Sequence, residues 1–327
     1  MTNEPLLTVE DLEVEFRTDD GVVKAVDRIS YTLEKGEVLA ILGESGSGKT
    51  VHARAIMRIL DTPPAFITGG RALLGELELF TLDEDDMREV RGAKIAMLFQ
   101  DPHTALDPVF TVGDQFQELL KQRQGMSAKA AREEAVKLME RVGIPSARAR
   151  LKAYPHELSG GIAQRVMVAM AIALGPDVLM ADEPTSSLDV TVQAQVLELL
   201  ASLIDETEMA MVLITHNLAV AVGLATRIAV MYAGRIVELG PAREVYADPK
   251  HPYTAGLLRS IPDIQVREER LPGIDGVPPN LLHLPGGCSF APRCPMVEDI
   301  CRAEVPPFEE VAPGRWSACF FANSVTR

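Results

Sequence analysis

Residues 43–50 read GESGSGKT, which matches the phosphate-binding pattern G-x-x-x-x-G-K-T. An apolar run at 37–43 predicts a buried strand before this segment, and residues 49–60 predict a helix after it. In that setting the glycines let backbone N–H groups curl around phosphates, and the N-terminus of the helix favours negative charge. We expect Lys49 to reach the β- and γ-phosphates and the Thr50 hydroxyl to ligate Mg²⁺. The residues expected to contact the nucleotide are Gly43, Glu44, Ser45, Gly46, Ser47, Gly48, Lys49 and Thr50.

Polar residues also follow apolar runs that predict buried strands elsewhere in the chain. At one such end, Asp182 would hold Mg²⁺ directly or through water, and Glu183 would orient and deprotonate an attacking water. A solvated acidic pair is the alternative there. His216 either has a structural role or donates a hydrogen bond to the γ-phosphate. Gln100 either caps backbone or senses Mg²⁺ and the γ-phosphate, so the candidate Mg²⁺ residues are Thr50, Gln100 and Asp182.

The segment Leu158-Ser159-Gly160-Gly161 precedes a nearly all-apolar helix predicted at 160–174. A helix N-terminus with free N–H groups is a site for anions. One nucleotide needs only one such helix, so two interpretations remain. Ser159 simply caps the helix, or Ser159, Gly160 and Gly161 contact a nucleotide that is held by another subunit.

The four cysteines lie near the C-terminus with the spacing C-x5-C-x6-C-x17-C, at Cys288, Cys294, Cys301 and Cys319. The closely spaced pairs that usually mark zinc sites are lacking. Four thiolates also hold iron–sulfur clusters. From the residues alone, an iron–sulfur cluster, a zinc ion and free thiols all stay open. We expect a structural role first, because the proline-rich tail lacks an apolar core of its own.

Strands and helices alternate along most of the chain, which predicts an α/β fold with a mostly parallel sheet. The segment 105–160 has no strand pattern and predicts an inserted helical subdomain, within which a helix at 127–142 starts at a serine cap. After residue 240 the chain holds more than half of its prolines and every cysteine, so we expect a loop-rich extension with a short helix near 251–260. Further strands are predicted at 94–100, 177–181, 209–215, 227–232 and 235–239, and a further helix at 189–207.

Composition narrows the classes of function. The chain has 327 residues, of which 47% are hydrophobic, and a formal net charge of −15. A full core can form, and such an acidic chain has no broad electrostatic attraction to nucleic acid. The longest near-continuous apolar run, 166–174, is far shorter than the roughly 20 residues that cross a bilayer as a helix, and residues 1–16 lack the pattern of a signal peptide. We therefore expect a cytosolic protein whose membrane role comes through partners.

The motifs GESGSGKT, LSGG, DEPTSSLD and ITH, in this order, resemble those of the ATP-binding cassette (ABC) transporter ATPases over about residues 6–240. The resemblance implies a P-loop NTPase fold with a RecA-like core, an antiparallel β part and a helical subdomain at about 105–175. It implies a nucleotide-binding domain at 1–240 and a C-terminal extension at 241–327. It also implies ATP and Mg²⁺ as cofactors.

The same resemblance implies a head-to-tail dimer in which each ATP lies between the P-loop of one subunit and the LSGG of the other. In such a dimer Gln100 is the Q-loop residue, Asp189 belongs to the D-loop and His216 is the switch histidine. Phe16 lies where the family often stacks an aromatic ring on adenine, although a core position in a strand fits its pattern equally well.

The segments YPHELSGGIAQRVMVAMAIAL, HPYTAGLLRSIP and PGGCSFAPRC resemble the ATPases of dipeptide and oligopeptide importers, most closely the dipeptide permease ATPase. This implies a subunit that hydrolyses ATP to power uptake of dipeptides or oligopeptides, although relatives also import nickel and other small solutes. It implies a second, related ATPase as heterodimer partner, two transmembrane permease subunits and, indirectly, an extracytoplasmic peptide-binding protein. The chain would then be peripheral on the cytoplasmic face of the inner membrane. Some of these ATPases carry a [4Fe–4S] cluster in the tail, which favours a cluster on the four cysteines.

Three positions depart from the family pattern: Ile162 after LSGG, Asn217 after the switch histidine, and Arg315-Trp316 near Cys319 where relatives often show Gly-His. Two rival classes are a soluble ABC ATPase that acts on nucleic acid or ribosomes, and a P-loop kinase or GTPase. The first needs a long coiled coil, tandem cassettes or basic surfaces, and the second has no use for LSGG. The acidic chain with one P-loop fits neither.

Overall fold

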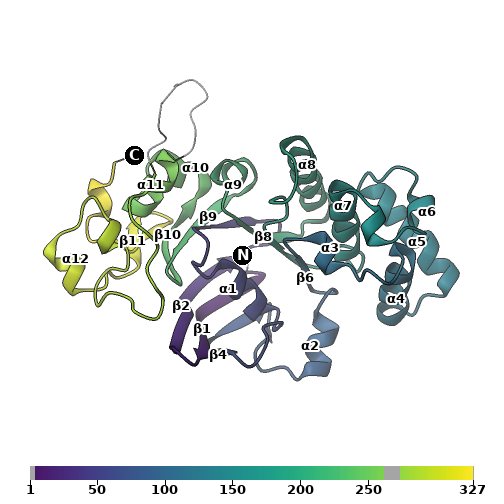
Figure 1. Ribbon diagram of the computed structural model, residues 1–327, viewed down its shortest axis with the longest axis horizontal. Coiled ribbons are helices and arrows are strands. Elements are labelled where there is room, and N and C mark those ends of the chain that lie inside the picture. Colours follow the sequence, from purple (N-terminus) through teal and green to yellow (C-terminus); the bar gives the residue numbers. More distant parts are fainter. Residues whose placement is uncertain (1–3, 261–272, 327) are drawn as a thin grey trace. The chain divides into compact units, whose positions relative to one another are not determined.

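A computed structural model describes residues 4–260 and 273–326 (Figure 1). The chain forms two compact units. Unit 1 comprises Met1–Leu33, Val38–Phe80 and Leu213–Arg327, and unit 2 comprises Glu34–Glu37 and Thr81–Val212. The phosphate-binding segment and the cysteine-bearing C-terminal segment therefore fold together in unit 1, although more than half of the chain separates them.

Unit 1 contains an antiparallel sheet near the N-terminus (purple in Figure 1). Its strands are β1 (Leu7–Thr18), β2 (Gly21–Leu33), β4 (Ala65–Leu74) and β5 (Leu77–Glu78), in the order β2-β1-β4-β5. On β1, Val14 lies opposite Val26 of β2, and register shifts fall on either side of Leu12. Such irregularities break the strict alternation that marks a strand in a sequence, and none of these four strands was predicted from the pattern.

Unit 1 also contains part of a larger sheet, in which the strand order is β11-β12-β10-β9-β3-β8. Strand β3 runs parallel to β9, with Ala40 opposite Ile228, and β9, β10, β12 and β11 then pair antiparallel. Every residue of β3 is buried, as the apolar run predicted. The C-terminal strands β11 and β12 extend this sheet. The bounds are β3 (Val38–Leu42), β8 (Ala210–Thr215), β9 (Arg227–Tyr232), β10 (Arg235–Pro241), β11 (Glu309–Ala312) and β12 (Arg315–Ser317).

The helices of unit 1 include one that is shorter than predicted. The helix expected at 49–60 ends at Ile56, because Arg58 has a left-handed backbone with φ 52° and two prolines follow at 63 and 64. The helix expected near 251–260 is confirmed, with His251 as its N-cap. The bounds are α1 (Lys49–Ile56), α9 (Leu218–Leu224), α10 (Ala242–Ala247), α11 (Pro252–Arg259) and α12 (Asp299–Ala303).

The C-terminal segment shares the core of unit 1 and does not form a separate one. Tyr253 on α11 and Phe290 belong to the same buried cluster as Ala40 on β3 and Val230 on β9. The rings of Tyr253 and Phe290 each pack against Tyr232, with centroids 4.6 Å and 5.2 Å away. The tail therefore obtains its apolar support from the sheet on which it folds.

A buried ion pair fixes the last strand to this sheet. Arg315 on β12 lies 3.4 Å from the Glu238 carboxylate on β10 and 3.3 Å from the Asp248 carboxylate, and Arg315 and Glu238 are 4% and 0% exposed. The Glu238 carboxylate also accepts hydrogen bonds from the backbone N–H groups of Lys250 and His251, at 2.7 Å and 2.9 Å. Arg315, which departs from the family pattern, thus offsets the charge of a buried carboxylate.

Unit 2 holds two parallel strands and a set of helices (α4 to α7 in Figure 1). The segment 105–160 is helical and has no strand, and Ser127 caps α5 by accepting from the Ala130 N–H, as predicted. The strands are β6 (Ile95–Leu98) and β7 (Val178–Asp182). The helices are α2 (Glu84–Val90), α3 (Pro102–Ala105), α4 (Val112–Gln124), α5 (Ala128–Arg141), α6 (Ala147–Arg150), α7 (Gly160–Ala171) and α8 (Val190–Thr207).

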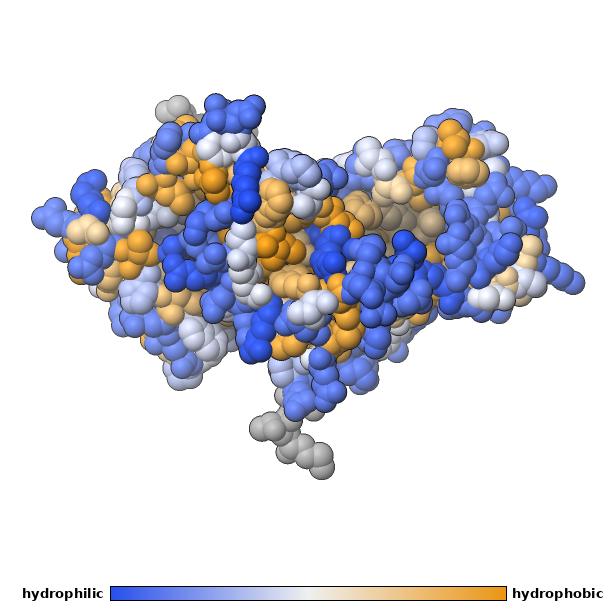
Figure 2. Space-filling model, turned by 90° about the horizontal axis from the view of Figure 1, so that it is seen from below, coloured by the Kyte–Doolittle hydropathy of each residue, from blue (hydrophilic) through white to orange (hydrophobic). Residues whose placement is uncertain are grey.

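Among residues 4–260 and 273–326, no helix combines the length and the apolar character that crossing a membrane requires. On the face shown in Figure 2, hydrophilic and apolar side chains are interspersed.

A buried histidine joins α1 to the antiparallel sheet. His52 is 0% exposed; its Nε2 lies 2.6 Å from the Tyr31 hydroxyl on β2 and its Nδ1 lies 3.1 Å from the Lys49 carbonyl oxygen. Burial lowers the pKa of His52 to about 4.

This depressed pKa predicts that unit 1 loses stability as the pH falls. Between the unfolded pKa of about 6.5 and the folded pKa of about 4, the unfolded chain binds the extra proton, so the stabilisation is complete above this range and is lost as the pH falls through it. Lowering the pH from 7.5 to 5.5 should cost about 1 kcal/mol through His52 alone. Fluorescence of Trp316, the single tryptophan and a residue of unit 1, reports thermal unfolding. His52→Gln should flatten the pH dependence, and an equally steep dependence in the variant would contradict this assignment.

Candidate nucleotide-binding and cysteine sites

The P-loop, residues Gly43–Thr50, joins β3 to α1 in unit 1 and passes very close to two neighbouring strands. Gly43 and Gly48 have φ 156° and 102°. A Cβ at Gly43 would lie 2.3 Å from the carbonyl oxygen of Met231 on β9, and one at Gly48 would lie 2.2 Å from that of Ala25 on β2. Neither position can carry a side chain unless backbone moves, which explains why the loop needs glycine at these two positions.

Lys49 places its charge inside this loop. Its Nζ donates hydrogen bonds to the carbonyl oxygens of Gly43 and Glu44, both at 2.8 Å, and the residue is only 5% exposed. The first turn of α1 contains no acidic residue. The buried ammonium and the helix N-terminus together make the loop favourable for a polyanion.

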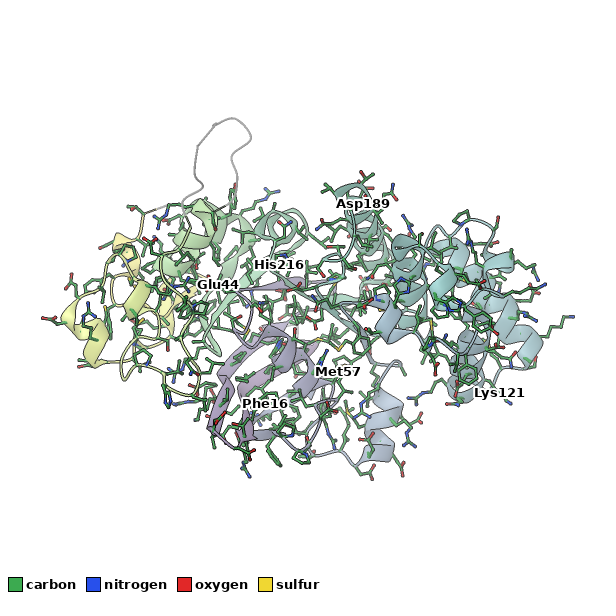
Figure 3. The ribbon with its side chains drawn as sticks, viewed as in Figure 1. Phe16, Glu44, Met57, Lys121, Asp189 and His216 are labelled. Atoms are coloured by element: carbon green, nitrogen blue, oxygen red, sulfur yellow. The ribbon has the colours of Figure 1, made fainter. Side chains whose placement is uncertain are left out.

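Glu44 in the P-loop, which is labelled in Figure 3, is held by two residues of the C-terminal segment. Its backbone N–H donates to the Tyr253 hydroxyl at 2.8 Å. The Arg293 guanidinium donates to both oxygens of the Glu44 carboxylate, at 2.7 Å and 3.0 Å. The sequence analysis missed both residues. The segments HPYTAG and APRC that contain them were visible, but a contact across 249 positions leaves no local pattern.

Two other candidates, Phe16 and His216, also lie in unit 1. Phe16 is half-buried on β1, and His216 is exposed directly after β8. The Asn217 side chain accepts hydrogen bonds from the N–H groups of Ala219 and Val220 and so caps α9. This departure from the family pattern therefore has a clear structural role at the start of the helix.

In unit 2, Gln100 and Glu183 lie together. The Gln100 side-chain amide donates to the Glu183 carboxylate at 3.3 Å. Asp182, the last residue of β7, is 2% exposed. Glu183 has a left-handed backbone with φ 46°, which a residue with a side chain adopts at an energetic cost and which is common at functional sites. The carboxylate of Glu183 thus sits at a strained turn, next to the side-chain amide of Gln100.

The signature residues also lie in unit 2, at the N-terminus of α7. Ser159 occupies the N-cap position, yet its exposed side chain makes no capping hydrogen bond. Asp189, labelled in Figure 3, caps α8 because its carboxylate accepts hydrogen bonds from the N–H groups of Thr191 and Val192. A Cβ on Gly161 would lie 2.7 Å from the Val192 side chain, so the N-termini of α7 and α8 touch. The structure therefore brings Ser159, Gly160, Gly161 and Asp189 into one region.

The four cysteines line one small cavity in unit 1, together with aromatic residues such as Phe290. Burial, together with the neighbouring thiols, raises the pKa of the thiols of Cys288, Cys294 and Cys319, and that of Cys319 reaches about 11. Thiolates at these positions therefore require a compensating cation. Within residues 4–260 and 273–326, no group of three or more His, Cys, Asp or Glu side chains is arranged to hold a metal ion.

Four thiols around a single cavity fit the donor set of an iron–sulfur cluster. The proline-rich loop and the aromatic walls would shield such a group from water.

Comparisons with known proteins cover nearly the whole chain. A profile described as "ABC transporter" matches residues 26–186, and one described as "Oligopeptide/dipeptide transporter, C-terminal region" matches residues 237–301. The dipeptide transport ATP-binding protein DppD of Escherichia coli (strain K12) is 47% identical over 321 residues, which are 97% of this chain and 96% of DppD. The oligopeptide transport ATP-binding protein OppD of the same organism is 48% identical over 96% of this chain and 93% of OppD.

Solved structures match about three quarters of the chain. The dimeric post-hydrolysis state of the ATP-binding cassette MJ0796 bound to ADP and Pi has a TM-score of 0.65 at 26% identity, covering 72% of this chain and 99% of that one. The protein cbiO1 from Clostridium perfringens, part of an ABC transporter complex, has a TM-score of 0.61 at 27% identity, covering 75% and 92%.

The close backbone approach at Gly48 predicts a specific loss of nucleotide binding in Gly48→Ala. The added methyl group would push the P-loop away from Ala25, so we expect the affinity for ATP to fall about tenfold or more, equivalent to about 1.4 kcal/mol. Titration of the purified chain with ATP on ice, before turnover matters, measures this affinity.

Gly75→Ala is the matched control, because Gly75 also has a left-handed φ, 58°, but an added Cβ meets nothing within 4 Å. It should cost about 1 kcal/mol of stability through backbone strain and leave ATP affinity unchanged. Equal ATP affinities in the two variants would show that the close approach at Gly48 is unimportant.

Proposed function

The chain belongs to the ABC transporter ATP-binding proteins of peptide importers, and from this membership we propose that it hydrolyses ATP to power the uptake of dipeptides or oligopeptides. The observation that carries the proposal is similarity along the full length. Both the cassette and the C-terminal region match, and two relatives named for dipeptide and oligopeptide transport share almost half of their residues with it. An importer of nickel or another small solute is the second candidate, since the family resemblance extends to such systems.

In the proposed cycle the P-loop amides and Lys49 bind the phosphates of ATP, and Mg²⁺ accompanies them. Glu183 accepts a proton from the attacking water, which is the role of a general base. The Gln100 amide, 3.3 Å from the Glu183 carboxylate, holds this carboxylate in place. Fixed backbone N–H groups stabilise the charge that develops on the transferred phosphoryl group. Phe16 is proposed to stack on adenine, and His216 to contact the γ-phosphate.

We assign Ser159, Gly160, Gly161 and Asp189 to a nucleotide bound by a second, related ATPase. The exposed Ser159 hydroxyl, which makes no capping bond, and the free N–H groups of α7 support this assignment. Two transmembrane permease subunits would then hold the chain at the cytoplasmic face of the membrane, and an extracytoplasmic binding protein would deliver the peptide.

Residues 1–240 are the proposed nucleotide-binding domain, with a helical subdomain at about 105–175, and residues 241–327 are the proposed extension. For the extension we propose a [4Fe–4S] cluster held by Cys288, Cys294, Cys301 and Cys319, with zinc as the alternative. The support is the cavity that all four thiols line and the raised pKa of three of them, which a cluster would counter.

Replacement of the proposed base tests the ATPase directly. Glu183→Gln keeps the size of the side chain but cannot accept the proton, so ATP should still bind while hydrolysis falls at least about a hundredfold. The assay requires the chain assembled with its partner subunits. Glu198→Gln, which removes an exposed carboxylate from α8 in the same unit, should hydrolyse ATP at the unaltered rate.

The same pair of variants tests the transport role. Cells that lack this chain should lose uptake of labelled dipeptides and regain it with Glu198→Gln but not with Glu183→Gln. Intact peptide uptake together with lost nickel uptake would replace the peptide proposal with the second candidate.

Metal analysis of anaerobically purified protein tests the cysteine site. We expect the protein to contain iron and acid-labile sulfide and to absorb visible light. All three should be lost in Cys301→Ser, because Cys301 is the most buried of the four cysteines. Zinc without iron would favour the alternative, and neither metal would leave four free thiols. Ser260→Ala, which removes a half-buried hydroxyl group at the C-cap of α11 and leaves all four cysteines in place, serves as the control for handling.

A further inference from the structure

We infer that the C-terminal segment of unit 1 positions the P-loop for nucleotide binding, with Arg293 and Tyr253 as the positioning residues. The inference builds on the proposed ATPase function. It adds that the affinity for nucleotide depends on two side chains that lie outside the cassette motifs.

Glu44 is the point at which the C-terminal segment and the P-loop meet. Its N–H is bonded to the Tyr253 hydroxyl, and its carboxylate is bonded to both terminal nitrogens of Arg293. Its carbonyl oxygen accepts a hydrogen bond from Lys49 at 2.8 Å. A shift of Glu44 therefore moves an acceptor of the lysine that would bind the phosphates.

The Arg293 contact is stronger than an ordinary surface ion pair. The side chain of Arg293 is 4% exposed and that of Glu44 is 28% exposed, and the two form a bidentate pair. The remaining guanidinium nitrogen donates to the Asp275 carbonyl oxygen at 3.0 Å, so the fork cannot rotate freely. Bidentate and partly buried pairs fix geometry as well as adding energy.

The loop that carries Arg293 is itself tightly held. Arg293 directly precedes Cys294, and the Cys288 N–H donates to the Cys301 carbonyl oxygen at 2.8 Å. A Cβ at Gly287 would lie 2.4 Å from that same oxygen, so this crossing requires glycine. Tyr253 is 0% exposed within the core of unit 1. Both positioning residues thus stand on rigid supports beside the P-loop.

The experiment measures the affinity of the full-length chain for ADP, which binds the same loop without being hydrolysed. Arg293→Ala and Tyr253→Phe should each weaken ADP binding about fivefold or more, the usual lower range for coupling between sites. Arg302→Ala, which removes an exposed arginine from α12 in the same segment, should bind ADP as the unaltered chain does. The double variant Glu44→Gln/Arg293→Ala tests whether the two residues act through one contact. If they do, its loss of ADP-binding free energy should be smaller than the sum of the losses in the two single variants.

The thermal unfolding of each variant, followed by Trp316 fluorescence, separates positioning from general damage. Tyr253→Phe loses only one hydroxyl group, so its unfolding temperature should lie within a few degrees of that of the unaltered chain. Its affinity for ADP should nevertheless be lower. If Arg293→Ala does not fold, Arg293→Lys, which keeps the charge but not the bidentate guanidinium, replaces it.

The outcomes separate this inference from the ATPase proposal. Unchanged ADP affinity in both Tyr253→Phe and a folded Arg293 variant would overturn the inference and leave the ATPase proposal intact. An unaltered chain that binds no ADP would refute the ATPase proposal itself.

Discussion

The structure of unit 1 depends on a close approach of backbone to backbone around the P-loop. Gly43 lies against a carbonyl of β9 and Gly48 against a carbonyl of β2, at distances that exclude a Cβ. The Gly234 N–H donates to the Ser47 carbonyl oxygen, and the Asp27 N–H donates to the Gly234 carbonyl oxygen. The loop is thereby tied to both sheets of unit 1. A loop fixed in this way presents its N–H groups without first having to order them, which lowers the entropic cost of binding an anion.

The sequence predicted those parts of the fold whose signal is local. Strands β3, β7, β8 and β9 are continuous apolar runs because they are buried on both faces, and each was placed from its pattern. The family and the fold class are likewise confirmed by the comparisons. The antiparallel strands β1, β2 and β4 were not placed individually, because register shifts interrupt the alternation of their side chains. The end of α1 was misjudged, since a left-handed Arg58 stops the helix within a run that otherwise reads as helical.

In the candidate site, too, the sequence predicted the residues with a local signal but not the distant contacts that hold them. Lys49, Asp182 and Glu183 could be named because strand ends and a glycine loop mark them in the sequence. The contacts that hold them could not be named: the bonds from Tyr253 and Arg293 to Glu44 span 209 and 249 positions. The buried pair of Arg315 and Glu238 was also hidden, since a single arginine in a polar stretch looks like a solvated residue until its carboxylate partner is known. Long-range polar contacts of this kind depend on the completed fold, and no short window of sequence contains both partners.

The contact between Glu44 and Arg293 has a consequence for biosynthesis. The ribosome synthesises a chain from its N-terminus, and Arg293 follows Glu44 by 249 positions. At about 5–20 residues per second, this interval is on the order of 10–50 s. During that time the nascent chain contains the P-loop but lacks Arg293, which binds the Glu44 carboxylate of this loop. On the inference above, tight binding of nucleotide arises only once Arg293 has been added and has reached Glu44, and a product that ends before this residue would bind nucleotide more weakly.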